Sequence, residues 1–406
     1  MVRFISTAFH IYASLYETVP DFADTWAEIL GDLARYRGTV ADEGTESRKK
    51  WQKMSQVWYN SAADRNPSEG RLYYHLAILS RPEYIKQLFY FCRSLTSGSI
   101  FLSARETIIT LFAHCSGTST NQSRAFINHF MRTHFSLFRN DFSEAHQHAV
   151  DFLRSFKLPS AYPPGRWLEE STQIAIINIA SLLDYGNWTP LRYTFEMRNH
   201  LSSLSTSVEG KEEELPDALR KPLLVGVPDL LDYKLKSDFL FGTLEIIRSS
   251  HRNLVLPHIH TVMTFLVSLV QAVAVTNKRF ASGVIDLQLF FERVPWRSLC
   301  DFLNGSIFDM ARKGVVEPFS RSNADQSRPL PEDYLLRGLI WTRNYFPSNW
   351  FETHMDMEDR LLDSVSTSKL RVERIIWLAH QLCFVRSTTH RRFHSTNAVP
   401  ARLYDF

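Results

Sequence analysis

The sequence predicts an all-α protein built from antiparallel helix pairs, and three observations carry this prediction. Apolar residues recur every three to four positions through most of the 406-residue chain, which is the period of an amphipathic helix. Residues 1–190 contain no convincing alternation of apolar and polar side chains, the pattern of a half-buried strand. Short polar segments with glycine or proline separate the helical stretches, as expected for helical hairpins.

The individual helices follow from these apolar stripes. A first helix is predicted over Phe4–Glu17, and a second over Phe22–Arg37 with Asp21 as its N-cap. Residues 38–47 are polar and contain glycine, so they predict a loop. Further helices are predicted, in chain order, at Lys49–Asp64, Ser68–Leu79, Glu83–Ser94, Ser103–Phe112, Gln122–Phe138, Phe142–Phe156 and Trp167–Leu183.

The strongest internal boundary is Pro159–Gly165, where prolines and a glycine interrupt the helical pattern. It separates a predicted 14-3-3-like or tetratricopeptide-type domain, residues 1–158, from a helical-hairpin domain, residues 166–385. The remaining segments are predicted to be two exposed loops and a mobile tail, at residues 202–222, 314–329 and 387–406.

Helical patterns return at residues 223–313 and 330–385. The longest apolar run, Thr261–Val275, is short for a membrane span and contains Gln271, so we expect a buried core helix and no membrane partner.

Composition and cysteine usage exclude several classes of protein. Lys and Arg number 46 against 43 Asp and Glu, so the chain is not a polycation. None of the four cysteines stands in a CxxC pair, which argues against a zinc ribbon or a disulfide scaffold. Cys92 and Cys383 lie in apolar patterns and are expected to be buried thiols in a reducing, intracellular compartment.

Motifs for catalysis and for metal binding are weak. The sequence carries neither GxSxG nor HExxH, and Ser116-Gly117-Thr118 lacks the pattern of a phosphate-binding loop, so we expect no enzyme and no cofactor. His146-Gln147-His148 and His258-Ile259-His260 offer histidines two positions apart. Such side chains point roughly 200° apart on a helix, so neither pair is expected to chelate a metal.

Two sets of motifs carry a more specific signal. The first comprises Leu30-Gly31-Asp32-Leu33-Ala34-Arg35-Tyr36-Arg37, Trp58-Tyr59-Asn60-Ser61-Ala62-Ala63, Asn66-Pro67-Ser68-Glu69-Gly70, Tyr74-His75-Leu76-Ala77-Ile78-Leu79 and Phe91-Cys92-Arg93-Ser94-Leu95. The second comprises Val294-Pro295-Trp296-Arg297-Ser298-Leu299, Phe302-Leu303-Asn304 and Leu330-Pro331-Glu332-Asp333-Tyr334-Leu335-Leu336-Arg337-Gly338. Together they resemble the ever-shorter-telomeres family of telomerase-recruitment proteins and its relatives in nonsense-mediated mRNA decay, in a fungal-like form that lacks the upstream helices.

The resemblance implies a non-catalytic all-α adaptor with a DNA/RNA-binding domain. Some members of the family bind phosphoserine peptides in a groove like that of 14-3-3 proteins, so the implied partner is a protein, with phosphorylated segments as candidates. The family's nuclease domain has no counterpart in this sequence. Its members work in the nucleus and in the cytoplasm, and the sequence leaves that choice open, along with the oligomeric state.

Arg35 and Tyr36 match the Arg-Tyr pair of the family's phosphopeptide helix. An arginine fork and a tyrosine hydroxyl suit phosphate oxygens. The alternative is that Arg35 pairs with Asp32 and that Tyr36 belongs to the core. Two family asparagines are replaced, by Tyr74 and by Thr107, and a basic residue from an upstream helix is missing. Arg71 and Arg105 could substitute for the missing basic groups if they point into the groove, and the alternative is that they face solvent. The candidate site residues are Arg35, Tyr36, Arg71, Tyr74 and Arg105.

A second hypothesis is direct binding of single-stranded RNA or telomeric DNA. Phe126–Arg139 interleaves aromatic and basic side chains, so Arg132 and Arg139 are candidate backbone contacts beside stacking phenylalanines. The alternative is that these phenylalanines form core. The tail segment His390–His394 either contacts nucleic acid or is solvated. A third hypothesis is a scaffold that keeps the fold and has lost its ligand.

Overall fold

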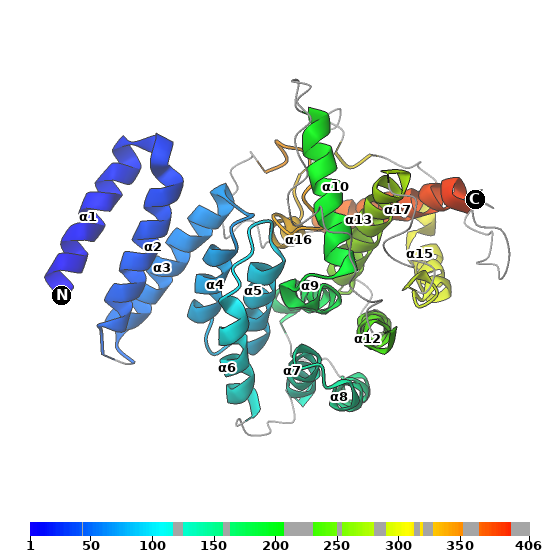
Figure 1. Cartoon of the computed structure of the whole chain (residues 1–406), viewed down its shortest axis with the longest axis horizontal. Coiled ribbons are helices and arrows are strands. Elements are labelled where there is room, and N and C mark those ends of the chain that lie inside the picture. The colour runs from blue at the N-terminus through cyan, green and yellow to red at the C-terminus, as the bar shows by residue number, and fades with distance from the viewer. Residues whose placement is uncertain are drawn as a thin grey trace. The chain divides into compact units, whose positions relative to one another are not determined.

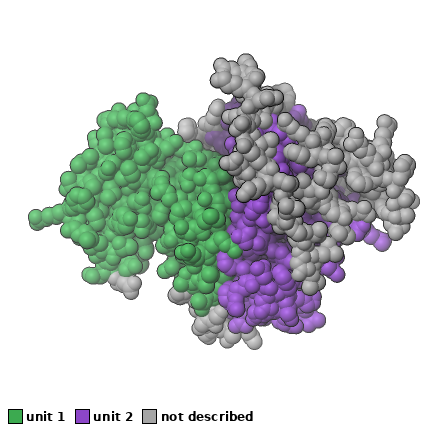
Figure 2. All heavy atoms as spheres, viewed as in Figure 1, with its two compact units in different colours: residues 1–117 green, residues 118–406 purple. Residues whose placement is uncertain are grey.

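The computed structural model confirms the all-α class. It describes residues 1–42, 44–116, 125–156, 163–206, 230–249, 254–279, 290–311, 317–319, 328–351 and 365–390. Within these ranges the regular elements are helices, and an isolated β-bridge joins Glu69 to Ser99. The chain divides into two compact units, Met1–Gly117 (unit 1) and Thr118–Phe406 (unit 2), coloured separately in Figure 2.

Unit 1 is a succession of helices in which each packs on the next in chain order (Figure 1). Its elements are α1 (Val2–Thr18), the 3-10 helix η1 (Pro20–Phe22), α2 (Ala23–Thr39), α3 (Glu46–Arg65), α4 (Gly70–Leu79), α5 (Tyr84–Thr96) and α6 (Ala104–Ser116). Asp21 lies inside η1 and is not the N-cap of α2, since that position belongs to Phe22, which makes no side-chain cap bond.

Small residues allow α2 and α3 to approach closely. A Cβ at Gly31 would lie 2.9 Å from the ring of Tyr59, so only glycine fits there without a shift of the tyrosine. The hydroxyl of Ser55 donates a 2.8 Å hydrogen bond to the carbonyl of Gly31, which fixes the crossing point. Aromatic side chains attach α1 to this pair, as in the edge-on contact of Tyr16 with Trp58.

Gly70 ties the start of α4 to the segment before α6. Its amide donates to the carbonyl of Ser99 at 2.8 Å, and the amide of Ser99 donates to the carbonyl of Ser68 at 2.8 Å. A Cβ at Gly70 would lie 2.5 Å from the carbonyl oxygens of both Ser94 and Ser99. This backbone junction therefore requires glycine.

Unit 2 is built around two long buried helices, α9 and α13. Its elements are α7 (Ala125–Phe138), α8 (Phe142–Ser155), α9 (Pro164–Leu182), η3 (Asp184–Gly186), α10 (Pro190–Thr206), α12 (Leu230–Arg248), α13 (Leu256–Arg279), α15 (Trp296–Ala311), α16 (Pro331–Leu336) and α17 (Val365–His390). The central helix α13 packs against α9, α10, α16 and α17. Among the described residues it alone is long and apolar enough to cross a membrane, and most of that stretch is buried inside unit 2, as expected of a core helix.

The division of the chain differs from the boundary that the sequence suggested at residues 159–165. Helices α7 and α8 belong to unit 2, because their aromatic side chains pack on the later helices. Phe130 and Phe152 both contact Phe239 of α12, with ring centroids 6.0 and 5.5 Å apart. This long-range aromatic packing has no local sequence signal.

The predicted loops and tail fall partly outside the described residues. Of residues 202–222, those up to Thr206 continue α10, and of residues 387–406, those up to His390 continue α17. Phe319, in the predicted exposed loop 314–329, packs edge-on against Trp350 at 5.0 Å, so it is part of a packed aromatic cluster. Residues 337–351, predicted to be helical, form successive turns.

Candidate functional site

Arg35 belongs to a partly buried network between α2 and α3. Its Nη2 lies 2.9 Å from a carboxylate oxygen of Asp32, and its Nε donates to the hydroxyl of Tyr59 at 3.2 Å. The same hydroxyl donates to Asp32 at 2.6 Å. Arg35 is therefore paired with Asp32, as the alternative to a phosphate site predicts. The same alternative places Tyr36 in the core, but Tyr36 is 49% exposed.

The network favours the charged forms of both partners. Burial raises the pKa of the Asp32 carboxyl, but hydrogen bonds from Tyr59 and Arg35 outweigh it and hold that pKa below its usual range. Burial and the hydrogen bond to Asp32 raise the pKa of the Tyr59 hydroxyl. The result is a fixed Arg35–Asp32 pair whose hydrogen-bonding groups are already largely used.

Arg71 of α4 forms an ion pair with Glu28 of α2, on the side of α2 that carries Asp32 and Arg35. Its Nη2 lies 2.5 Å from Oε1 of Glu28, and the Arg71 side chain is 47% exposed against 18% for Glu28. Burial raises the pKa of Glu28, and the neighbouring Asp32 and Glu69 raise it further, while Arg71 opposes the shift. Glu28 is therefore a desolvated carboxyl that depends on one half-exposed arginine.

His75 lies near both ion pairs, close enough for Asp32, Arg35 and Arg71 to affect its charge. Its ring stacks on that of Tyr59, with centroids 4.8 Å apart and planes 10° from parallel. Burial lowers the pKa of His75 to about 4, with Asp32 opposing the shift and Arg35 and Arg71 adding to it. The imidazole is neutral at pH 7, so the charged groups here are Arg35 and Arg71 against Glu28, Asp32 and the neighbouring Glu69.

Tyr74 continues the face from α4 to α6. Its hydroxyl lies 3.4 Å from Oγ1 of Thr107, and its ring packs on Phe101 with centroids 5.0 Å apart. Arg105, the second residue of α6, is half-buried. We call the α2–α4–α6 face the set Glu28, Asp32, Arg35, Arg71, Tyr74, His75 and Thr107.

The sequence missed two members of this arrangement, Glu28 and Tyr59. A signal for Glu28 was present, because Glu28, Asp32 and Arg35 stand at i, i+4 and i+7 and so share one side of a helix. Tyr59 reads as core from its small neighbours, and its ring is indeed fully buried. Only its hydroxyl contacts the charged groups. No local sequence pattern predicts this contact.

Of the candidate nucleic-acid residues, Arg132 lies on α7 and Arg139 directly follows its last residue, Phe138. Arg132 and Arg139 are exposed, and the guanidinium of Arg139 lies 5.3 Å from the ring centroid of Phe135. Phe126 and Phe130 are buried, with 2% and 0% exposure, so they cannot stack on bases. For these two phenylalanines the core alternative holds, which leaves the two arginines without the expected row of stacking rings.

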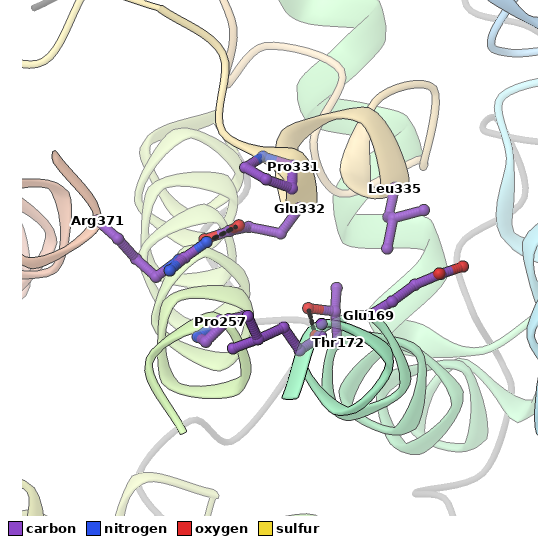
Figure 3. A pocket seen from close by; sticks show the side chains of 9 residues that line it. Glu169, Thr172, Pro257, Pro331, Glu332, Leu335 and Arg371 are labelled. Carbon is purple, nitrogen blue, oxygen red and sulfur yellow. Dashed lines mark hydrogen bonds and ion pairs between the residues drawn. The ribbon is translucent and has the colours of Figure 1, made fainter. Parts of the chain in front are cut away.

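Unit 2 contains a small depression beside a buried ion pair (Figure 3). Arg371 of α17 contacts Glu332 of α16 through two hydrogen bonds, of 2.6 and 3.0 Å, and Nδ1 of His260 lies 3.0 Å from the same carboxylate. The opening admits a volume of about 20 Å³, room for a water molecule and too little for a cofactor. Its lining residues are Gly165, Leu168, Glu169, Thr172, Pro257, Pro331, Glu332, Leu335 and Arg371.

The two histidines of His258-Ile259-His260 have separate structural partners. Nδ1 of His258 lies 2.7 Å from the carbonyl of Ser171, while His260 faces Glu332. The acidic residues of the Leu330–Gly338 motif are likewise structural, because Asp333 pairs with Arg374 at 3.2 Å and accepts a hydrogen bond from the indole of Trp350. These groups hold α9, α13, α16 and α17 together.

The α2–α4–α6 face thus presents two charge-balanced pairs, of which one, Arg71–Glu28, is open to solvent on its basic side. An incoming anionic group would have to compete with the Glu28 carboxylate for Arg71. No protein-family model matches this chain, and no curated protein matches it either.

Proposed function

We propose that this chain is a non-catalytic helical adaptor, active in RNA-decay or telomere-related complexes. In this proposal the α2–α4–α6 face of unit 1 binds a segment of a protein partner, and unit 1 has the tetratricopeptide or 14-3-3-like arrangement. One observation carries the proposal: Arg35, Arg71 and Tyr74, three of the five candidate residues, share one face although α2 and α4 are not consecutive. The resemblance of those motifs to the ever-shorter-telomeres family supplies the biological setting.

The ligand chemistry that best suits this face is a phosphoserine. A phosphate carries up to two negative charges and three acceptor oxygens, so it competes well for a guanidinium. Arg71 is the group it would take, because this side chain is half-exposed and its present partner is a desolvated carboxyl. Arg35 already forms hydrogen bonds with Asp32 and Tyr59. We therefore expect it to attract the phosphate through its positive charge and not through a direct hydrogen bond.

The test is fluorescence polarisation of the full chain with labelled degenerate peptides that carry one central phosphoserine, beside the unphosphorylated pool. We expect the phosphorylated pool to bind more tightly and Arg71→Ala to abolish the difference. Glu28→Gln should strengthen phosphopeptide binding, since it frees Arg71 from its carboxylate. Lys53→Ala removes one positive charge from an exposed position of α3 and should change nothing.

Other outcomes select the competing hypotheses. Equal binding of both pools would overturn phosphate recognition. Binding of single-stranded RNA that falls steeply with salt, and that weakens in Arg132→Ala and Arg139→Ala, would favour direct nucleic-acid binding. A folded protein that binds neither ligand would be a scaffold without the proposed activity.

A further inference from the structure

Two histidines and an aspartate come together between α7 and α8 of unit 2. His129 lies on α7, and His148 and Asp151 lie on α8, which packs directly beside α7 (Figure 1). One candidate ligand atom from each residue lies within 4.8 Å of the other two. The sequence offers no hint of this, because His129 and His148 are far apart in the chain and the apparent pair was His146 with His148.

The helix geometry explains why these groups converge. Glu144, His148 and Asp151 stand at i, i+4 and i+7, so they share the side of α8 that faces α7. The rings of His129 and His148 lie with centroids 6.4 Å apart. Oε1 of Glu144 lies 3.5 Å from Nε2 of His148, which orients that ring from behind.

A second observation points to a ligand at this place. Nδ1 of His129 and Nδ1 of His148 are both buried, and neither has a hydrogen-bond partner within the part of the chain that the structure describes. Buried nitrogens of this kind are usually satisfied. Two such nitrogens beside a carboxylate form the donor set that borderline divalent metals prefer.

We propose that His129, His148 and Asp151 bind a divalent transition-metal ion of the Zn²⁺ class, with Glu144 as the group that orients His148. Two imidazoles and one carboxylate supply three protein ligands and leave a position for water. A carboxylate hydrogen-bonded to the far nitrogen of a liganding histidine is a common supporting contact. The ion joins α7 to α8, and this role is independent of the peptide-binding function proposed for unit 1.

The side chains must close around the ion by a modest amount. Zn²⁺ bonds of about 2.0–2.1 Å place tetrahedral ligands roughly 3.4 Å apart, so atoms within 4.8 Å of each other must approach by about an ångström. All three side chains are half-buried and can move that far by small rotations. The exposed side chain of Gln147 donates to Asp151 at 3.2 and 3.3 Å. Breaking these hydrogen bonds would free the Asp151 carboxylate to bind the ion.

The charges around the cluster allow a cation. Asp151 and Glu144 contribute two negative charges, against one positive charge on Arg132 near His129.

The test is titration of the chelator-treated full chain with Co²⁺, followed by its visible d–d absorption and by competition with Zn²⁺. We expect one Co²⁺ per chain, displaced by Zn²⁺, and a rise in the melting temperature of unit 2. His129→Gln and His148→Gln should each remove the absorption, while Asp151→Asn should weaken binding strongly. Glu144→Gln should weaken it roughly tenfold, as expected for a supporting carboxylate.

His146→Gln is the matched control, because His146 is exposed on the same helix and should bind Co²⁺ as the parent does. Circular dichroism establishes that each variant is folded, and the polar glutamine substitutions are chosen to keep it so. The proposal is overturned if the parent chain shows no Co²⁺ absorption. It is equally overturned if His129→Gln and His148→Gln bind Co²⁺ as the parent does, or if His146→Gln loses it.

Discussion

The hydroxyl of Tyr59 donates a 2.6 Å hydrogen bond to the carboxylate of Asp32 and accepts one from Arg35. A single side chain from α3 therefore fixes the ion pair of α2. The ring can reach this place because Gly31 presents no Cβ to it. The stability of the α2–α3 contact and the geometry of the charged face thus depend on the same residue.

Tyr59→Phe should reduce the free energy of unfolding by about 1–2 kcal/mol, because it leaves a partly buried carboxylate short of one hydrogen bond. Tyr84→Phe, at the start of α5, removes the same hydroxyl outside this network and serves as the control. Urea denaturation of both variants measures the difference. Equal stability of Tyr59→Phe and the parent would contradict the proposed role of the hydroxyl.

Gly70→Ala should destabilise unit 1 by about 1–3 kcal/mol, the usual range for an overpacked site. The new Cβ would lie 2.5 Å from two carbonyl oxygens, and backbone atoms cannot step aside as a flexible side chain can. Gly165→Ala is the matched control, because a Cβ there meets nothing within 4 Å. Thermal melts of the two variants should separate clearly.

Acid should destabilise the folded chain well before its carboxylates titrate. Burial lowers the pKa of His134 to about 3, and burial lowers that of His258 to about 4 and that of His75 to about 4. The unfolded chain takes up these protons near pH 6.5, whereas the folded chain resists them. Stability is therefore full above about pH 6.5 and is lost as the pH falls towards 4.

Each of these histidines should add up to about 1.4 kcal/mol per pH unit to the slope of stability against pH. His134→Gln should remove one such contribution, while the hydrogen-bonding positions near Asn178 and Tyr185 stay within reach of the glutamine. Urea unfolding at pH 7, 6 and 5 gives the slope. A stability that is constant across this interval would show that the three imidazoles are not buried in neutral form.

Arg371→Ala should be one of the most damaging single substitutions in unit 2. It leaves the fully buried carboxylate of Glu332 without its guanidinium, and breaking a buried pair in this way costs about 3–5 kcal/mol. The double variant Glu332→Gln with Arg371→Met should recover part of the loss, because no uncompensated charge remains. Lys49→Ala, at an exposed pair on α3, should leave the melting temperature unchanged.

The fold class and most helices could be predicted from the sequence because apolar spacing reports local conformation directly. The predicted helix over Phe142–Phe156, for example, corresponds to α8 almost residue for residue. The boundary at residues 159–165 could not be placed correctly, since the contacts of Phe130 and Phe152 with Phe239 join segments about a hundred residues apart. Contacts between such distant segments do not affect the spacing of apolar residues within each helix, so the sequence pattern does not predict them.

The candidate site was predictable only in part. The motifs point to Arg35 and Tyr74, Arg71 is a possible substitute for a missing basic group, and these three residues do share one face. Their pairing with Glu28 and Tyr59 depends on how α2, α3 and α4 cross, which spacing within one helix does not determine. The α7–α8 histidine cluster was missed for the same reason, because its members belong to different helices.

The order of packing in unit 1 has a consequence for how it comes apart. Each helix packs on its neighbour in the chain. Ile5 is the one buried residue of α1, so this terminal helix is held mainly by edge-on aromatic contacts such as Tyr16 with Trp58. Fraying from that end would expose amide protons of α1 to exchange while the junction at Gly70 still holds α4 to the segment before α6. Amide exchange in unit 1 should therefore be graded along the chain, slowest around α4 and α5 and fastest at the amino end.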